Sequence, residues 1–226
     1  MPNPNPSAPN ARAAILARLR QNALPSADST TAPVSEADWL RRQPPLGDLA
    51  ERFIREQEAV GSLVKRVPTW EALPVLAPPW LKEHGVRSVI TGRVERLEPL
   101  RRALADAGMA VGRYDRPVEQ KRAELFNTDC GITGSVGGIA ETGSIVLIPG
   151  AEEPRLLSLA VPIHLALVER ARLHPTLLDF IASGVYQRDV PTNLVLVSGA
   201  SRTADIELTL AMGVHGPKLL LVALIG

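Results

Sequence analysis

The sequence predicts an α/β protein with a mostly parallel sheet flanked by helices. Between residues 63 and 114, short apolar runs typical of strands alternate with longer amphipathic runs typical of helices, and this order indicates β-α-β units. Near the C-terminus, the uninterrupted apolar run Leu219–Ile225 predicts a strand that is covered on both faces. A hydrophobic content of 45% in 226 residues provides ample material for a core.

The first 45 residues predict an arm that precedes this α/β domain. Residues 1–10 are rich in Pro and Asn and are expected to be disordered, whereas residues 11–20 place apolar side chains on one face of a helix. Residues 22–45 are rich in Pro, Ser, Thr and Ala. They predict an irregular segment that either packs on a partner subunit or serves as a surface linker. The α/β domain then takes up residues 46–226.

The first half of the domain reads as helices and strands in turn. Pro74 and Pro78-Pro79 are expected to break the helical pattern of residues 69–83, and Gly108 is expected to end a helix over 94–107. The expected elements are helices over 46–58, 69–83, 94–107 and 118–126, and strands over 63–67, 86–91 and 109–114.

Glycine and proline divide the second half. The glycine-rich run Cys130–Ile148 suits two strands joined through residues 138–143. Residues 156–168 begin like a strand, but Pro162 interrupts the pattern, so a helix or loop is expected from about His164. The other expected elements are a helix over 175–183, a strand covered on both faces over 192–198, a helix over 203–212 that Gly213 ends, and a strand over 218–225.

The glycine-rich run carries one carboxylate, Glu141, at its centre. The glycines remove side chains from a segment otherwise rich in Ile and Val, which permits a sharp turn or a close approach of the backbone to a ligand. Glu141 is therefore a candidate base or nucleophile, with a structural carboxylate held by backbone N–H groups as the alternative. The predicted ligand-binding residues of this run are Gly138, Thr142, Gly143 and Ser144.

A second candidate segment follows the strand at 192–198. The turn 199–203 is expected to open a helix, and the free N–H groups and dipole of a helix N-terminus attract a phosphate or carboxylate. In the alternative, Ser201 only caps the helix and Arg202 pairs with a carboxylate. We interpret the two segments as the walls of one anion-holding cleft. The predicted ligand-binding residues of the second wall are Gly199, Ser201, Arg202, Thr203, Asp205 and Gly216.

Histidine and cysteine add few candidates. His215 lies in the tight loop Gly213–Pro217 beside a strand, where histidine is an unusual choice for packing, and it is a second candidate catalytic residue. His164 could face the same cleft, and Cys130 is interpreted as inert core. No ligand pair has the spacing of a metal site, so no metal is predicted. A single cysteine also excludes an iron–sulfur cluster held by this chain alone.

Charge and hydropathy argue against several classes of protein. Lys and Arg number 25 against 24 Asp and Glu, and this balance argues against nucleic-acid binding. The longest apolar run, Leu219–Ile225, is far shorter than the ~20 residues that span a bilayer. The N-terminus shows no basic segment followed by an apolar one, so we expect no signal peptide and a cytoplasmic location.

Four segments carry a further signal: Asp129-Cys-Gly-Ile-Thr-Gly134, Ile139-Ala-Glu-Thr-Gly-Ser144, Ser201-Arg-Thr-Ala-Asp-Ile-Glu207 and Gly213-Val-His-Gly-Pro217. With them, the sequence from about residue 46 onward resembles the lactate-utilisation (LUD) domain family, most closely its lactate utilisation protein C branch. The resemblance implies an α/β sheet of the kind shared by NagB, ribose-phosphate isomerase (RpiA) and CoA-transferases.

The resemblance also implies a role in oxidising L-lactate to pyruvate with two partner proteins, at least one of which carries iron–sulfur clusters. The leading hypothesis is therefore a cytoplasmic subunit of such a system, which holds a small carboxylate or anionic cofactor of unknown identity. One alternative is a free-standing transferase or isomerase, because Glu141-Thr-Gly143 is similar to the Glu-x-Gly nucleophile segment of CoA-transferases. Another is a non-catalytic scaffold that binds partners through residues 1–45. A homo-oligomer is compatible with each.

Overall fold

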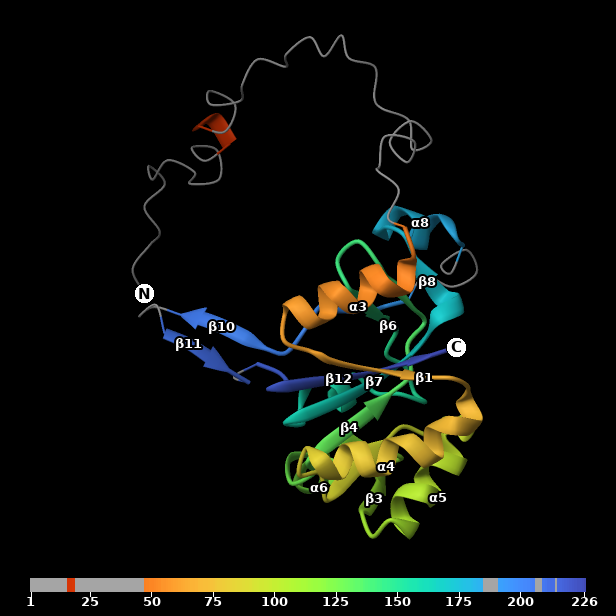
Figure 1. Ribbon diagram of the computed structural model, residues 1–226. Helices are drawn as coiled ribbons and strands as arrows, with labels where there is room; N and C mark the ends of the chain where they lie inside the picture. Colours follow the sequence, from red (N-terminus) through yellow and green to blue (C-terminus); the bar gives the residue numbers. More distant parts are fainter. Residues whose placement is uncertain (1–15, 19–46, 185–190, 206–208, 214) are drawn as a thin grey trace, which may run out of the picture. The chain divides into compact units, whose positions relative to one another are not determined.

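Six parallel strands form the central sheet, in the order β1-β12-β7-β4-β2-β3 (Figure 1). The computed structural model describes residues 16–18, 47–184, 191–205, 209–213 and 215–226. The predicted α/β class with a mostly parallel sheet is confirmed. The strands are β1 (Leu63–Val67), β2 (Ser88–Thr91), β3 (Ala110–Arg113), β4 (Cys130–Thr133), β7 (Ile163–Glu169) and β12 (Leu219–Ile225).

Helices cover both faces of this sheet. On one face, α4 (Leu73–Glu83) and α5 (Glu98–Asp106) bury apolar side chains against alternate residues of the strands, such as Val89 and Leu165. On the other face, α6 (Val118–Phe126) and α7 (Leu156–Leu159) pack against Ile90, and α3 (Leu49–Ala59) packs against β7 and β12. Short 3₁₀ helices, Trp70–Ala72, Glu95–Leu97 and Arg170–Arg172, follow β1, β2 and β7.

A second, four-stranded sheet lies beyond α3 on that face and has the order β8-β5-β6-β9. Phe53 of α3 is fully buried in the cluster that joins the two sheets. The strands of this second sheet are β5 (Gly137–Ile139), β6 (Ser144–Leu147), β8 (Leu173–His174) and β9 (Val195–Val197). Helix α8 (Leu177–Ala182) packs beside them. The two strands predicted in the glycine-rich run belong to different sheets. The first corresponds to β4 of the central sheet, and the second corresponds to β6, which pairs with β5 in the second sheet.

Two predictions that rested on proline are wrong. The run after His164 is neither a helix nor a loop but β7, which pairs with β12 along its whole length. Pro162 precedes the strand, where no ladder hydrogen bond is required, and its carbonyl accepts from the N–H of Lys218 at 2.9 Å. Helix α4 also continues through Pro78 and Pro79. Burial of Trp80 and Leu81 in the core outweighs the two lost hydrogen bonds.

Two further predictions near the C-terminus need correction. Strand β9 exists, but it lies at the edge of the second sheet, and Leu196 is 42% exposed, so it is not covered on both faces. In place of a helix over 203–212, β10 (Arg202–Asp205) and β11 (Thr209–Met212) pair antiparallel. The apolar spacing suggested a helix, but both strands contain β-branched threonine, which favours extended backbone. The helix predicted there extends into residues 206–208, which lie outside the described residues.

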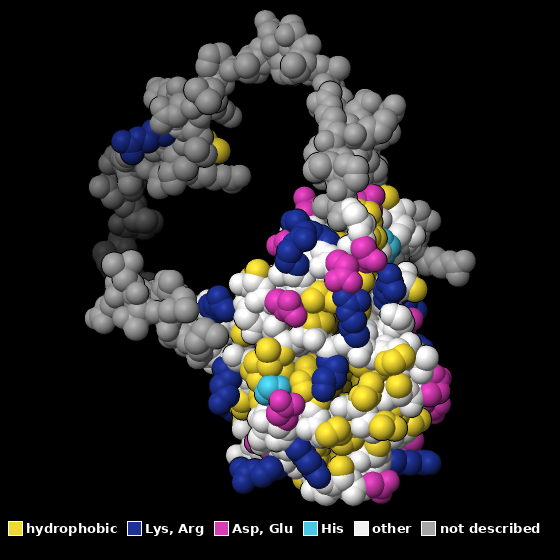
Figure 2. Space-filling view, viewed as in Figure 1, with side chains coloured by type: hydrophobic (Ala, Val, Ile, Leu, Met, Phe, Trp, Pro, Cys, Tyr) yellow, Lys and Arg dark blue, Asp and Glu magenta, His cyan; other side chains and the backbone are white. Residues whose placement is uncertain are grey.

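The surface of the α/β domain has mixed charge. On the face shown in Figure 2, Lys and Arg side chains alternate with those of Asp and Glu. Several of them form exposed ion pairs, such as Arg66 with Glu51 at 2.5 Å and Arg113 with Glu98 at 2.8 Å. None of the helices within the described ranges combines the length and apolar character needed to cross a bilayer.

Candidate functional site

The strand order places a topological switch point between β2 and β4. From β2 the chain crosses through α5 to β3 on one side, whereas β4 lies on the other side of β2 and leads on toward β7. The loops that leave β2 and β4 therefore diverge. In open α/β sheets the crevice between such loops, at the carboxyl ends of the strands, is the usual place for a ligand.

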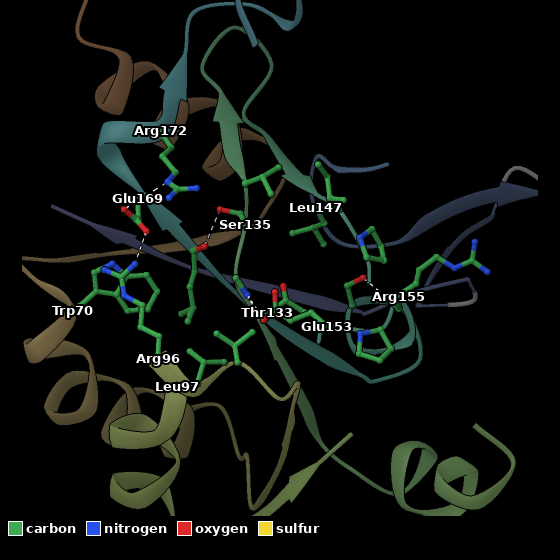
Figure 3. A pocket seen from close by; sticks show the side chains of 18 residues that line it. Trp70, Arg96, Leu97, Thr133, Ser135, Leu147, Glu153, Arg155, Glu169 and Arg172 are labelled. Atoms are coloured by element: carbon green, nitrogen blue, oxygen red, sulfur yellow. Dashed lines mark hydrogen bonds and ion pairs between the residues drawn. The ribbon is translucent and has the colours of Figure 1, made fainter. Parts of the chain in front are cut away.

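A cavity of about 230 Å³ occupies this crevice (Figure 3). Three groups of residues line it: residues 94, 96 and 97 after β2, residues 133–136 at the end of β4, and residues 147–149 and 153–155 between the end of β6 and α7. Trp70 and the end of β7 complete the wall. The cavity is thus built from segments up to about a hundred residues apart that the parallel sheet brings to one edge.

The segment before α7 is tied down on both sides of the switch point. The N–H of Arg93, after β2, donates to the carbonyl of Glu152 at 2.7 Å, and the N–H of Gly134, after β4, donates to Glu153 Oε1 at 2.9 Å. A Cβ at Gly134 would lie 3.3 Å from Glu153 Oε2, a tight contact. Gly134 therefore permits the backbone of the β4 loop to approach the Glu153 carboxyl.

Charged side chains are arranged asymmetrically around the cavity. Glu169 Oε1 lies 2.9 Å from Arg96 Nη1, and Glu169 Oε2 lies 3.8 Å from Arg172 Nε. The Arg96 guanidinium also stacks over the Trp70 ring at 3.8 Å. Figure 3 shows Arg172 and Glu169 on one side of the cavity and Glu153 on another, while the Arg155 side chain points away from the centre. Guanidinium groups are the side chains best suited to bind a carboxylate or another anion.

Glu153 is the carboxyl group in this cavity that no cation neutralises among the described residues. Burial raises the pKa of its carboxyl, and the charge of Glu152 acts in the same direction, while the N–H of Gly134 opposes both. Glu153 therefore takes up a proton more readily than an ordinary glutamate, as a group that exchanges protons with a ligand requires.

Behind the cavity floor, Thr133 contacts a buried histidine. Thr133 Oγ1 and His164 Nε2 are 2.8 Å apart, and His164 is fully buried in β7. Burial lowers the pKa of His164 to about 4, so the imidazole is neutral at pH 7. Its Nδ1 has no hydrogen-bond partner among the described residues. The pair fixes the Thr133 hydroxyl at the end of β4.

The residues predicted for the first wall lie away from this cavity, around the turn between β5 and β6. The Thr142 and Ser144 hydroxyl groups are 2.7 Å apart, and Ser144 Oγ lies 2.6 Å from Ser198 Oγ. Ser144 of the first predicted wall thus contacts Ser198, which directly precedes the turn of the second. The main-chain N–H of Glu141 donates to the carbonyl of Pro175 at 3.0 Å. The carbonyl of Glu141 accepts from the Arg52 guanidinium at 3.3 Å.

The residues predicted for the second wall pack on the other end of α3. The Arg202 guanidinium donates to the carbonyl of Val60, and Gly199 also lies against Val60. Arg52 and Val60 are eight residues apart along α3, about 12 Å at 1.5 Å per residue. The contacts of Glu141 and of Arg202 are therefore well separated, and a shared anion site at these residues stays a prediction. Because β10 follows the turn, the argument from a helix dipole is wrong.

The other predicted residues have structural contacts or are exposed. The N–H of Ser201 donates to the carbonyl of Pro217 at 2.8 Å. This hydrogen bond brings the turn at Ser201 beside Gly216 of the loop Gly213–Pro217. His215 is exposed, and the side chains of Thr203 and Asp205 lie outside the described part of the structure. Within the described ranges, no group of three or more His, Cys, Asp or Glu could hold a metal ion. Burial raises the pKa of Cys130 to about 12, which makes it an inert thiol.

Reasoning from sequence missed the cavity residues. Thr133 and Gly134 belong to the glycine-rich run and to one of the four segments that carry the family resemblance. Their position at the end of a strand was the signal in the sequence that could have identified them as cavity residues. Arg96, Glu153 and Arg172 stand singly in unremarkable loops, and no spacing in the sequence connects them.

Comparisons with known proteins agree with this architecture. An uncharacterised protein of Neisseria meningitidis is 39% identical over 124 residues, which are 54% of this chain and 53% of that protein. Lactate utilization protein C of Bacillus subtilis is 30% identical over 168 residues, 69% of this chain and 64% of that protein. The chain thus spans between about half and two-thirds of these relatives' length.

A solved structure and a family model extend the comparison. The crystal structure of a DUF162 family protein from Deinococcus radiodurans is similar with a TM-score of 0.61 and 25% identity, and it covers 81% of this chain and 100% of that one. The model of the LUD domain matches residues 50–225, which include the whole central sheet and every described residue that lines the cavity. This chain therefore belongs to the LUD domain family.

Proposed function

We propose that the protein is a component of a cytoplasmic lactate-utilisation system, in which its switch-point cavity binds a small carboxylate. Relatives named lactate utilization protein C support the pathway. In the proposed system L-lactate is oxidised to pyruvate with two partner proteins, and iron–sulfur clusters in a partner carry the electrons. A single cysteine, buried in β4, cannot supply the thiolates of such a cluster.

The single observation that carries the binding proposal is the position of Arg172. A guanidinium has five N–H donors, and the nearest contact of Arg172 with Glu169 is a loose one of 3.8 Å at Nε. Glu169 is bound more closely by Arg96, at 2.9 Å. Arg172 therefore keeps donors for a second carboxylate, and Figure 3 shows its side chain reaching from the 3₁₀ helix after β7 toward the cavity.

Binding of L-lactate and of pyruvate to the full chain, measured by calorimetry, tests this proposal. Replacing Arg172 with Ala removes a charge-assisted contact, and we expect affinity to fall roughly 10- to 100-fold. Arg102→Ala is the matched control, because Arg102 also pairs with a glutamate, Glu98 at 3.4 Å, but on the exposed side of α5. Equal affinity of the two variants would show that Arg172 is not the carboxylate anchor.

Growth on L-lactate tests the pathway. We expect a strain that lacks this gene to grow slowly on L-lactate and normally on pyruvate, and the wild-type gene to restore growth. The gene for Arg172→Ala is expected to restore it poorly, provided that the variant accumulates to the same level. Growth of the deletion strain on L-lactate at the wild-type rate would remove the protein from the pathway.

A further inference from the structure

We propose that Glu153 makes the cavity selective between 2-hydroxy acids and 2-oxo acids, by accepting a hydrogen bond from the hydroxyl group of the former. This inference rests on the proposed function, because it takes the carboxylate of the ligand to be bound at Arg172. It assigns to the cavity a second recognition point, directed at the group that distinguishes lactate from pyruvate.

The two glutamates of the cavity differ in what they can still bind. Both carboxylate oxygens of Glu169 lie beside an arginine, one beside Arg96 and one beside Arg172. Glu153 Oε1 accepts from the N–H of Gly134 at 2.9 Å, but Oε2 has no hydrogen-bond partner among the described residues. Oε2 is therefore the acceptor that the cavity offers to a ligand.

The chemistry of the two ligands then decides the preference. The hydroxyl of a 2-hydroxy acid donates a hydrogen bond, so it pairs with an ionised Glu153. The oxo oxygen of a 2-oxo acid is an acceptor without a proton, and against a carboxylate it places two acceptors in contact. A site that must hydrogen-bond a hydroxyl discriminates well against an analogue that lacks it, because the buried acceptor is left unpaired.

Acidic pH should weaken the preference, since a protonated Glu153 becomes a donor that suits an oxo oxygen. Burial moves the pKa of Glu153 upward, the N–H of Gly134 opposes this, and the neighbouring charge of Glu152 adds to the rise. Other charged groups around it come from each neighbouring segment: Arg155 on its own loop, Arg93 and Arg96 after β2, Glu169 at the end of β7, and Arg172 after β7. His164, behind Thr133, is neutral above its pKa of about 4.

Dissociation constants of L-lactate and pyruvate, measured at pH 8 and pH 5.5, test the inference. For the wild type we expect a preference for L-lactate of about tenfold or more at pH 8, and a smaller one at pH 5.5. Glu153→Gln keeps an acceptor for the N–H of Gly134 and adds N–H donors, so it should lose the preference at both pH values. Glu152→Gln removes the neighbouring charge that helps to raise the pKa of Glu153, so it should keep the preference at pH 8 and lose it only at lower pH than the wild type.

The outcomes separate this inference from the proposed function. If both acids bind and Glu153→Gln keeps the wild-type ratio, the inference is overturned while the binding site stands. Equal affinity of the wild type for the two acids at pH 8 has the same consequence. If neither acid binds the wild type, the proposed ligand class and this inference fail together. Equal melting temperatures of the variants and the wild type ensure that the ratios are compared on folded protein.

Discussion

The burial of His164 predicts that the protein loses stability between neutral and mildly acidic pH. His164 is fully buried in the centre of the sheet, and burial lowers its pKa from 6.5 to about 4. Between these values the unfolded chain binds a proton at this position that the folded protein does not. The contribution of His164 is thus fully present above pH 6.5 and is lost as pH falls toward 4.

The size of the effect follows from the shift in pKa. Each unit of pKa corresponds to about 1.4 kcal/mol, so the whole interval amounts to about 3 kcal/mol, of which about 2 kcal/mol is lost between pH 7.5 and pH 5. This is a considerable share of the 5–15 kcal/mol typical of folded domains. Urea unfolding followed by tryptophan fluorescence measures it at each pH.

Substitution distinguishes the contribution of His164 to the pH dependence of stability from the contributions of the other titrating groups. His164→Gln retains an amide donor for Thr133 but does not titrate, so its stability should fall by about 2 kcal/mol less than that of the wild type over the same interval. His215→Gln, at an exposed histidine, should show the wild-type dependence. The reasoning is refuted if His164→Gln loses as much stability as the wild type between pH 7.5 and pH 5.

Three further predictions concern stability and can be read from the urea midpoint. Gly131→Ala would push a Cβ into the carbonyl oxygen at the start of α7 and should cost about 1–3 kcal/mol, whereas Gly150→Ala, in open space, should be nearly neutral; equal midpoints would contradict this. Asp129 accepts from two main-chain N–H groups and a hydroxyl at the start of β2, so Asp129→Ala should cost about 1–3 kcal/mol and the exposed Asp106→Ala little. Phe53→Ala should cost about 3–5 kcal/mol, because Phe53 is fully buried between the two sheets; a small loss would show that α3 packs loosely there.

The parallel sheet was predictable because its signal is local. Strands covered on both faces read as apolar runs, and Leu219–Ile225 is such a run. The errors arose where a local rule met a tertiary contact. Proline argued against regular structure at 78–79 and 162, yet α4 continues through a buried Pro78 and an exposed Pro79, and β7 begins just after Pro162. Apolar spacing favoured a helix over 203–212, but the pairing of two short strands prevailed.

The candidate site could be predicted far less well than the fold. The cavity exists because strand order makes two loops diverge, and strand order is a property of the whole domain that a single sequence does not display. Arg96, Glu153 and Arg172 come from three different loops and meet only in the folded protein. The shared cleft between Glu141 and the Ser201–Thr203 turn stays a prediction; Ser144 does contact Ser198, just before that turn, because β6 and β9 pair directly.

The glycine-rich run shows how one sequence feature can have two causes. A Cβ at Gly138 would lie 2.6 Å from Leu173 and 3.1 Å from Phe53, and Gly143 has a positive φ of 67° where the turn presses on α3. These glycines let the second sheet and the helix pack closely, so packing explains them without a ligand. Gly134 differs, because its nearest neighbour is the Glu153 carboxyl that lines the cavity. Within this run, residues 133–136 at the end of β4 and residues 147–148 at the end of β6 line the cavity, whereas the turn at Glu141 does not, and it is β4 that brings the run to the carboxyl edge of the central sheet.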